Sequence, residues 1–232
     1  MKTKIFISLF VLFFSAATLT AQEEKTMYVM KDGAVTHKIA ASEIDSIVFI
    51  YDPLIFDKCV MINGVKWATR NVSSPGTFAA TPEAPGMFYQ WNYTVGWPAT
   101  GNVTGWDSNI PAGTTWGIAN DPSPDGYRAP TLAEIQSLLN IAFVTNEWTT
   151  ENGVSGRKFI DRASGKSIFL PAAGYRSYYD GALYYAGDKG YYWSSTQHNS
   201  NSAHTFYFGS GNALWYDYYE RNVGFSIRPV TD

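Results

Sequence analysis

The chain has 232 residues, with 17 basic and 20 acidic side chains and a formal net charge of −3. A mildly acidic chain without a cluster of Lys and Arg offers little to phosphates or anionic lipid, so we expect no nucleic-acid partner. Its one cysteine, Cys59, excludes an intramolecular disulfide, so the stability of the fold must come from its core.

Residues 1–21 are predicted to be an export signal. Two lysines precede an apolar run, Ile5 to Phe14, that is shorter than the about 20 residues needed to span a bilayer. Small residues follow, and we expect cleavage after Ala21, with Ala17 as the alternative. No cysteine lies near this point, so we expect no lipoprotein. The mature protein is expected in the periplasm, at the cell surface or outside the cell, without membrane insertion.

Residues 26–52 are predicted to form a small β-rich leader unit. Asp32-Gly33 lies between two apolar runs, which is a strong hairpin signal. Residues 42–45 suggest one helical turn, and residues 46–51 a third strand. Because so few strands enclose little core, we expect this unit to add strands to one side of the following domain.

From residue 58 to residue 232 the pattern favours one α+β domain with long loops. Asn63-Gly64, between short apolar runs, predicts a tight hairpin. Residues 73–126 are rich in Pro, Gly, Thr and Asn, a composition typical of loops. Disordered segments are poor in aromatic residues, so we expect these loops to be ordered by tryptophans that form the loops' own core: Trp91, Trp97, Trp106 and Trp116.

One helix and several strands are predicted in the second half of the chain. Thr131 and Glu134 have the spacing of a capping box, and apolar residues at helical spacing follow. Beyond Trp148 the pattern returns to short strands, with turns at Asp180-Gly181 and at residues 209–212. The last three strands are expected at residues 203–208, 213–219 and 223–230.

Five motifs in this order resemble the Fibrobacter succinogenes major paralogous domain, a family of exported bacterial proteins, over roughly residues 58–231. The resemblance implies a C-type-lectin-like fold related to the formylglycine-generating (sulfatase-modifying) enzymes. In that fold a few helices and a small twisted antiparallel sheet support long loops, with the first and last strands paired. The leader unit resembles a segment common on secreted Bacteroidetes proteins. The motifs are Ile62–Val72, Asp125–Thr131, Leu170–Arg176, Gly190–Thr196 and Phe225–Val230.

The chemistry that such a resemblance could imply is missing from this chain. The formylglycine-generating enzymes use two active-site cysteines, and only Cys59 is present. Related iron-dependent enzymes need a histidine cluster, whereas His37, His198 and His204 are scattered. Calcium-dependent lectins use a Trp-Asn-Asp triplet, which Trp91-Asn92-Tyr93 breaks. We therefore predict no enzyme, no cofactor, no metal site and no catalytic residues.

Other candidate sites have plainer interpretations. Asp121 and Asp125 could offer oxygens to Ca²⁺, but a Pro-Asp-Gly turn before the helix is favoured. His198 and His204 could share a zinc ion, but a third ligand is not apparent. Ser194-Ser195 has no nucleophile-elbow motif and fits the end of a strand better. Cys59 is interpreted as a small buried hydrophobe.

Eleven of the sixteen tyrosines lie between Tyr175 and Tyr219. Successive strand residues face opposite ways, so the Tyr-Tyr pairs, among them Tyr191-Tyr192, are expected to place one ring inward and one outward. Outward rings with Asn and Trp have the composition of a recognition surface. A solvent-facing sheet with cross-strand aromatic pairs is an equally weighted alternative. The candidate ligand-binding residues are Tyr178, Tyr179, Tyr184, Tyr185, Asn199, Asn201, Trp215, Tyr216 and Tyr218.

These observations favour a secreted, non-catalytic recognition module that binds a glycan or a protein. The ligand is expected on the C-terminal sheet and its loops, not on the Trp-rich loops of residues 91–116. A structural subunit of a surface assembly, with the leader unit as a pairing edge, is one alternative. An enzyme with an unrecognised active site is another.

Overall fold

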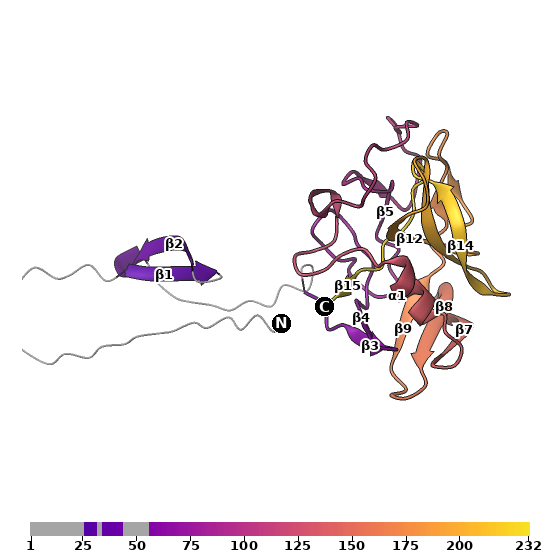
Figure 1. Ribbon diagram of the computed structural model, residues 1–232, viewed down its shortest axis with the longest axis horizontal. Coiled ribbons are helices and arrows are strands. Elements are labelled where there is room, and N and C mark those ends of the chain that lie inside the picture. Colours follow the sequence, from indigo (N-terminus) through magenta and orange to yellow (C-terminus); the bar gives the residue numbers. More distant parts are fainter. Residues whose placement is uncertain (1–25, 32–33, 44–55) are drawn as a thin grey trace, which may run out of the picture. The chain divides into compact units, whose positions relative to one another are not determined.

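The computed structural model describes residues 26–31, 34–43 and 56–232 (Figure 1). The chain divides into two compact units, Met1–Ile50 and Tyr51–Asp232. The expected export signal at residues 1–21 and the expected strand at residues 46–51 lie outside the described residues. Within the described residues, no helix has both the length and the apolar character that crossing a membrane requires.

The described part of the first unit is a pair of antiparallel strands. β1 (Thr26–Lys31) pairs with β2 (Ala34–Ala40), which confirms the predicted hairpin strands. The Asp32-Gly33 turn itself lies outside the described residues. The helical turn expected near Ser42 is a 3-10 turn, η1 (Ala41–Glu43). The expected docking of this unit on the following domain stays a prediction.

The second unit is mostly β, with one short α-helix among its described residues. Its small antiparallel sheets and long loops agree with the sequence analysis, but it contains less helix than an α+β class suggests. The elements are β3 (Val60–Ile62), β4 (Val65–Trp67), β5 (Met87–Tyr89), β6 (Gly96–Pro98), η2 (Ile118–Asn120), α1 (Leu132–Leu138), β7 (Val144–Glu151), β8 (Val154–Asp161), β9 (Ser167–Pro171), β10 (Tyr175–Arg176), β11 (Leu183–Tyr184), β12 (Gly190–Gln197), β13 (Ser202–Phe208), β14 (Ala213–Glu220) and β15 (Val230–Thr231).

The two larger sheets, β7-β8-β9 and β12-β13-β14, are built from neighbouring strands (Figure 1). A third sheet, β15-β4-β3, joins the two ends of the unit, because the last strand pairs with β4. The expected direct pairing of the first and last strands does not occur, because β4 lies between β3 and β15 in this sheet. Asn63 and Gly64 adopt positive φ angles of 43° and 82° between β3 and β4, which confirms the predicted hairpin.

The helix α1 begins as its capping box predicts. Thr131 Oγ1 accepts a hydrogen bond from the Glu134 backbone N–H, and Glu134 Oε2 accepts one from the Thr131 backbone N–H. Burial raises the pKa of the Glu134 carboxyl, but bonds from Arg128 and Thr131 outweigh it and lower that pKa. Ile135 and Leu138 are buried, so the predicted apolar stripe faces the core.

Strand β12 is covered on both faces by two hydrophobic clusters. Tyr192 belongs to one cluster, with Phe206 and Phe208, while Tyr191 and Trp193 belong to the other. Both Tyr191 and Tyr192 are therefore buried, and the expectation of one inward and one outward ring is wrong for this pair. Alternation along a strand exposes a ring only where one face of the sheet is open to solvent.

Residues 223–229 do not form the strand that was predicted there. Val223, Phe225 and Ile227 are buried in one core cluster. The segment makes isolated bridges to β5, β10 and β12 instead of pairing continuously with one neighbour. It passes between several sheet edges, so no single ladder can form, and only Val230 and Thr231 join a sheet, as β15.

Three arginines are fully buried: Arg176 and Arg228, which belong to the motifs, and Arg221. Arg176 donates to the carbonyl oxygens of Pro98, Thr100 and Gly101, at 2.6–3.1 Å from its Nη2. Burial lowers the pKa of all three guanidinium groups. A buried charge needs hydrogen-bond partners, and here loop carbonyls supply them, so these side chains fix the long loops to the sheets.

The tryptophans of the loops pack on one another, as predicted. Trp91 and Trp116 meet edge to face at 5.6 Å, and Trp97 lies 4.9 Å from Trp106 between ring centroids. Trp91 is fully buried and also belongs to a main core cluster, so this pair extends beyond the loops' own core. Aromatic pairs of this kind order a segment that has little regular secondary structure.

Asp57 links segments near the start of the second unit through hydrogen bonds and an ion pair. Its Oδ1 accepts from the Thr69 and Cys59 backbone N–H groups, and its Oδ2 lies 2.9 Å from Arg70 Nε. Burial raises the Asp57 pKa, but these bonds outweigh it and the net pKa is lowered. Cys59 is half-buried, with Sγ 3.6 Å from Tyr127 Oη, so the expected full burial is wrong. Burial raises the pKa of the Cys59 thiol.

Candidate functional site

Six tyrosines form one cluster at the C-terminal sheet, which we call the tyrosine cluster. The ring of Tyr175 lies 5.0–6.5 Å from four other rings of the cluster. Beneath them Phe225 stacks on Tyr191 at 5.2 Å and fixes the cluster to the core. The cluster consists of Tyr175, Tyr184, Tyr185, Tyr191, Tyr207 and Tyr219.

Burial raises the pKa of two phenols of the tyrosine cluster, Tyr175 and Tyr191, so these two hydroxyl groups stay protonated at ordinary pH. Burial raises the pKa of Tyr175, and the nearby phenols of Tyr219, Tyr185, Tyr184 and Tyr178 raise it further. A neutral phenol can both donate and accept a hydrogen bond. The cluster therefore presents aromatic faces together with convergent hydroxyl groups.

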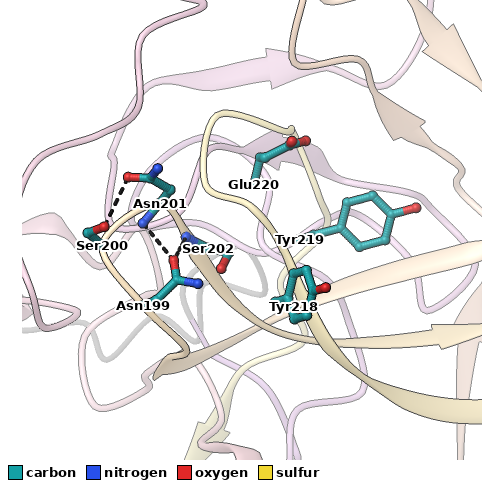
Figure 2. A pocket seen from close by; sticks show the side chains of 7 residues that line it. All are labelled: Asn199, Ser200, Asn201, Ser202, Tyr218, Tyr219 and Glu220. Carbon is teal, nitrogen blue, oxygen red and sulfur yellow. Dashed lines mark hydrogen bonds between the residues drawn. The ribbon is translucent and has the colours of Figure 1, made fainter.

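A polar pocket of about 450 Å³ lies beside the cluster (Figure 2). Tyr219 lines this pocket and also contacts Tyr175, so the pocket and the tyrosine cluster adjoin. Amides, hydroxyls, one carboxylate and two tyrosines line it, a set suited to ligands rich in hydroxyl groups. The lining residues are Asn199, Ser200, Asn201, Ser202, Tyr218, Tyr219 and Glu220.

The loop that forms one wall of the polar pocket is held by its own hydrogen bonds. Asn199 Oδ1 accepts from the backbone N–H groups of Asn201 and Ser202, at 2.8 and 2.9 Å (Figure 2). Ser200 Oγ donates to Asn201 Oδ1 at 3.1 Å. This turn fixes the backbone before any ligand arrives, so ordering the wall adds little entropic cost to binding.

Arg221 holds the polar pocket against the long loops. Its Nη2 donates to the Asn199 carbonyl and its Nη1 to the Gly113 carbonyl, each at 2.6 Å. The guanidinium also lies 4.3 Å from the ring centroid of Trp91. Residues distant in sequence are thus joined under the pocket, which explains why a charged side chain is buried there.

The structure brings five of the predicted site residues together. Tyr184 and Tyr185 belong to the tyrosine cluster, while Asn199, Asn201 and Tyr218 line the polar pocket. The Tyr184 and Tyr185 rings are both exposed, so the expected inward–outward alternation is wrong for this pair. Tyr184 ends β11, and Tyr185 has a φ of 56°, so the alternation of a strand does not continue through them.

The remaining predicted site residues are not members of the tyrosine cluster and do not line the polar pocket. Tyr178 and Tyr179 are both exposed in the turn between β10 and β11, so alternation fails there too. Trp215 is opposite Phe206 in the sheet and shares its face, which is the other face from Tyr207. Nothing is described of the Tyr216 side chain.

Sequence reasoning did not single out Tyr175, Tyr207, Tyr219 or Glu220. Tyr207 and Tyr219 come from β13 and β14, on the face that also holds Tyr191. Residues two apart in a strand lie on the same face of the sheet, so this spacing in β13 and β14 could have indicated the shared face. The approach of Tyr175 from β10 depends on the packing of a distant hairpin, which no local pattern indicates.

The other candidate sites have structural partners. Asp121 accepts from the backbone N–H groups of Ser123 and Ala129, as expected of a turn before the helix. His198 stacks on Tyr218, with ring centroids 4.7 Å apart. Ser194 lies within β12 and donates to the His204 carbonyl at 2.8 Å. In the described ranges, no three His, Cys, Asp or Glu side chains are grouped as a metal site would require.

Comparison with known proteins gives one match. A family described as a domain of unknown function, DUF8237, matches residues 143–230, which include β7 to β14 and therefore the tyrosine cluster and the polar pocket. No curated protein matches the chain. No solved structure matches it either.

Proposed function

We propose that this chain is a non-catalytic recognition module that binds a saccharide through the tyrosine cluster and the polar pocket. The observation that carries the proposal is the adjacency of the two features through Tyr219. Aromatic faces can cover the apolar side of a sugar ring, while amides and hydroxyls bond its hydroxyl groups. We also propose that the protein is exported and that residues 58–232 have a C-type-lectin-like fold of the major paralogous type.

A role in binding rather than catalysis is supported by the environment of the acidic groups. Asp57 and Glu134, whose carboxyl pKa values are lowered, hold a loop and a helix start. Neither lines the polar pocket. General acid–base catalysis commonly needs a carboxyl whose pKa is raised toward neutrality. Two exposed rings of the tyrosine cluster, Tyr184 and Tyr185, together with a polar pocket are instead suited to adhesion.

The proposal is tested with residues 22–232 on an array of glycans and host proteins, followed by calorimetry on any ligand found. The Tyr184→Ala/Tyr185→Ala double variant is expected to weaken binding at least about tenfold, since exposed aromatic anchors contribute ~1–4 kcal/mol. Tyr179→Ala is the matched control, because Tyr179 is 77% exposed in the neighbouring turn. Circular dichroism should show the same fold for all variants.

Four outcomes would count against the proposal. Binding of proteins alone would replace the saccharide by a protein ligand. Full binding by the folded double variant, with loss on changing Trp97 or Trp106, would move the site to the loops. Turnover of a bound saccharide would identify an enzyme instead. Absence of binding to every glycan and protein would remove the recognition function itself.

A further inference from the structure

A second pocket adjoins the tyrosine cluster through different rings. Its volume is about 550 Å³, and Tyr185 and Tyr207 of the cluster line it together with Trp148 of β7. Asn212 and Ser155 add an amide and a hydroxyl to its wall. Part of the wall comes from the turn at residues 209–212. We call this site the lysine pocket, after the cation described next.

Lys189 supplies a positive charge in the lysine pocket. Its Nζ lies 4.1 Å from the ring centroid of Tyr185 and 5.6 Å from that of Tyr207. Among the described residues Lys189 takes part in none of the ion pairs within 4.0 Å. The two rings therefore orient the ammonium group while leaving it able to pair with an external anion.

The backbone around Lys189 is fixed from both sides. The Lys189 N–H donates to the Tyr185 carbonyl at 3.0 Å, and the Lys189 carbonyl accepts from Gly174 at 2.8 Å. The next residue, Gly190, begins β12. A side chain that starts from so rigid a backbone, and whose stem packs on aromatic rings, loses less conformational entropy on binding than a free surface lysine.

Asp188 lines the same pocket, so the site carries both signs of charge. A bare anion such as phosphate gains from Lys189 but is repelled by Asp188. A hydroxylated acid can satisfy both groups, because its carboxylate pairs with Lys189 while a hydroxyl donates to Asp188. This mixed set therefore favours a sugar acid over a simple anion.

The tyrosine cluster links the two pockets. Tyr219 lines the polar pocket and Tyr185 lines the lysine pocket, and both rings lie within 6.5 Å of Tyr175. The Tyr175 ring thus lies between the polar pocket, which carries the Glu220 carboxylate, and the lysine pocket, which carries Lys189 and Asp188. An unbranched ligand of a few sugar units could occupy both at once, which adds the binding energies without a second cost of association.

From this arrangement we infer that the ligand is an acidic oligosaccharide whose carboxylate-bearing unit occupies the lysine pocket, with its following units over the tyrosine cluster and in the polar pocket. This inference rests on the proposed function and specifies its ligand class. Lys189 is the residue that selects acidic over neutral chains. Tyr185 belongs to the tyrosine cluster and also lines the lysine pocket, so it contributes to the binding of both acidic and neutral chains.

The test measures calorimetric binding of residues 22–232 to matched pairs of oligosaccharides. The acidic probes are trigalacturonate, an oligoglucuronate and an oligosialate, and the neutral probes are the corresponding uncharged oligosaccharides. Acetate, inorganic phosphate and a sulfated disaccharide separate a plain anion or a sulfate from a sugar carboxylate. The variants are Lys189→Gln and Lys189→Arg, with Lys166→Gln as the control, because Lys166 is exposed outside the pocket.

At least one acidic probe is expected to bind more tightly than its neutral counterpart, with an affinity that falls as salt is added. Lys189→Gln should weaken that binding by about ten- to a hundredfold, the loss of one charged hydrogen bond. Lys189→Arg should retain most of it, and Lys166→Gln should change nothing. Binding of the neutral probes should be the same in wild type and Lys189→Gln.

Several results would overturn the inference. Equal affinity for acidic and neutral probes, or no effect of Lys189→Gln, would remove Lys189 as the selecting residue while leaving saccharide recognition in place. Preference for acetate, phosphate or the sulfated disaccharide would replace the sugar carboxylate by a different anion. Failure of every saccharide, acidic or neutral, would instead reject the proposed function on which the inference rests.

Discussion

The substitution Arg228→Met tests whether the buried arginines hold the fold together. Arg228 Nε donates to Asn71 Oδ1 at 2.8 Å, and its Nη groups donate to the carbonyls of Phe169 and Ala68 at 3.0 and 3.3 Å. Methionine keeps much of the apolar stem but leaves these three acceptors without a donor. Each unsatisfied buried acceptor costs about 1–3 kcal/mol. Removing the buried charge also removes the free-energy cost of its desolvation, which offsets part of this loss. We therefore expect a net destabilisation of about 3–5 kcal/mol.

Urea unfolding of residues 22–232, followed by tryptophan fluorescence, measures this loss. A decrease of that size is a large part of the stability of a typical domain and should lower the midpoint markedly without changing the slope. Arg162→Met is the control, because Arg162 is exposed and its side chain donates only to the Ile141 carbonyl in the described contacts. If Arg228→Met is as stable as the wild type, the carbonyl network does not stabilise the fold and the reasoning fails.

Three further predictions follow from the described contacts. The folded-state pKa of Asp57 is lowered, so its contribution to stability is complete above the ordinary carboxyl pKa of 3.8 and is lost as the pH falls below that value. Asp57→Asn should therefore reduce the loss of stability that urea titrations measure as the pH is lowered below about 4, and an unchanged slope there would contradict this. Gly156→Ala would place a Cβ 2.3 Å from the Leu170 carbonyl oxygen of the paired strand, so we expect thermal unfolding to show a loss of stability of about 1–3 kcal/mol. Gly211→Ala is the control and should leave stability unchanged, because a Cβ there meets no atom within 4 Å. The leader unit is predicted to add strands to the main domain, so limited proteolysis that at once released a stable 58–232 fragment would count against it.

Much of the local structure could be predicted from the sequence because its causes are local. The Thr131–Glu134 capping box and the Asn63-Gly64 turn each act within a few residues, and both occur as expected. The same chemistry marks Asn152-Gly153, with φ angles of 48° and 82°, as the turn between β7 and β8. The sequence analysis did not use that signal, and so it missed the longest hairpin of this sheet.

The errors arise where a residue's environment depends on distant segments. Tyr191 and Tyr192 obey the alternation of a strand, but both faces of β12 are covered, so both rings are buried. Trp215 is exposed as expected, yet it lies on the opposite face from the tyrosine cluster. Composition alone indicated an aromatic surface, but only the packing of β10 and β11 on the sheet shows which rings meet.

The position of residues 223–231 has a consequence for how the chain reaches its folded state. Val223, Phe225 and Ile227 complete one hydrophobic cluster and Val230 completes the other, while β15 pairs with β4 near the opposite end of the unit. Within this unit these residues are synthesised after all the others, so neither cluster can close before they are added. Pairings between distant segments also form slowly. Commitment to the native state is therefore expected only once residues 223–231 have been synthesised, and removal of residues 223–232 should abolish folding.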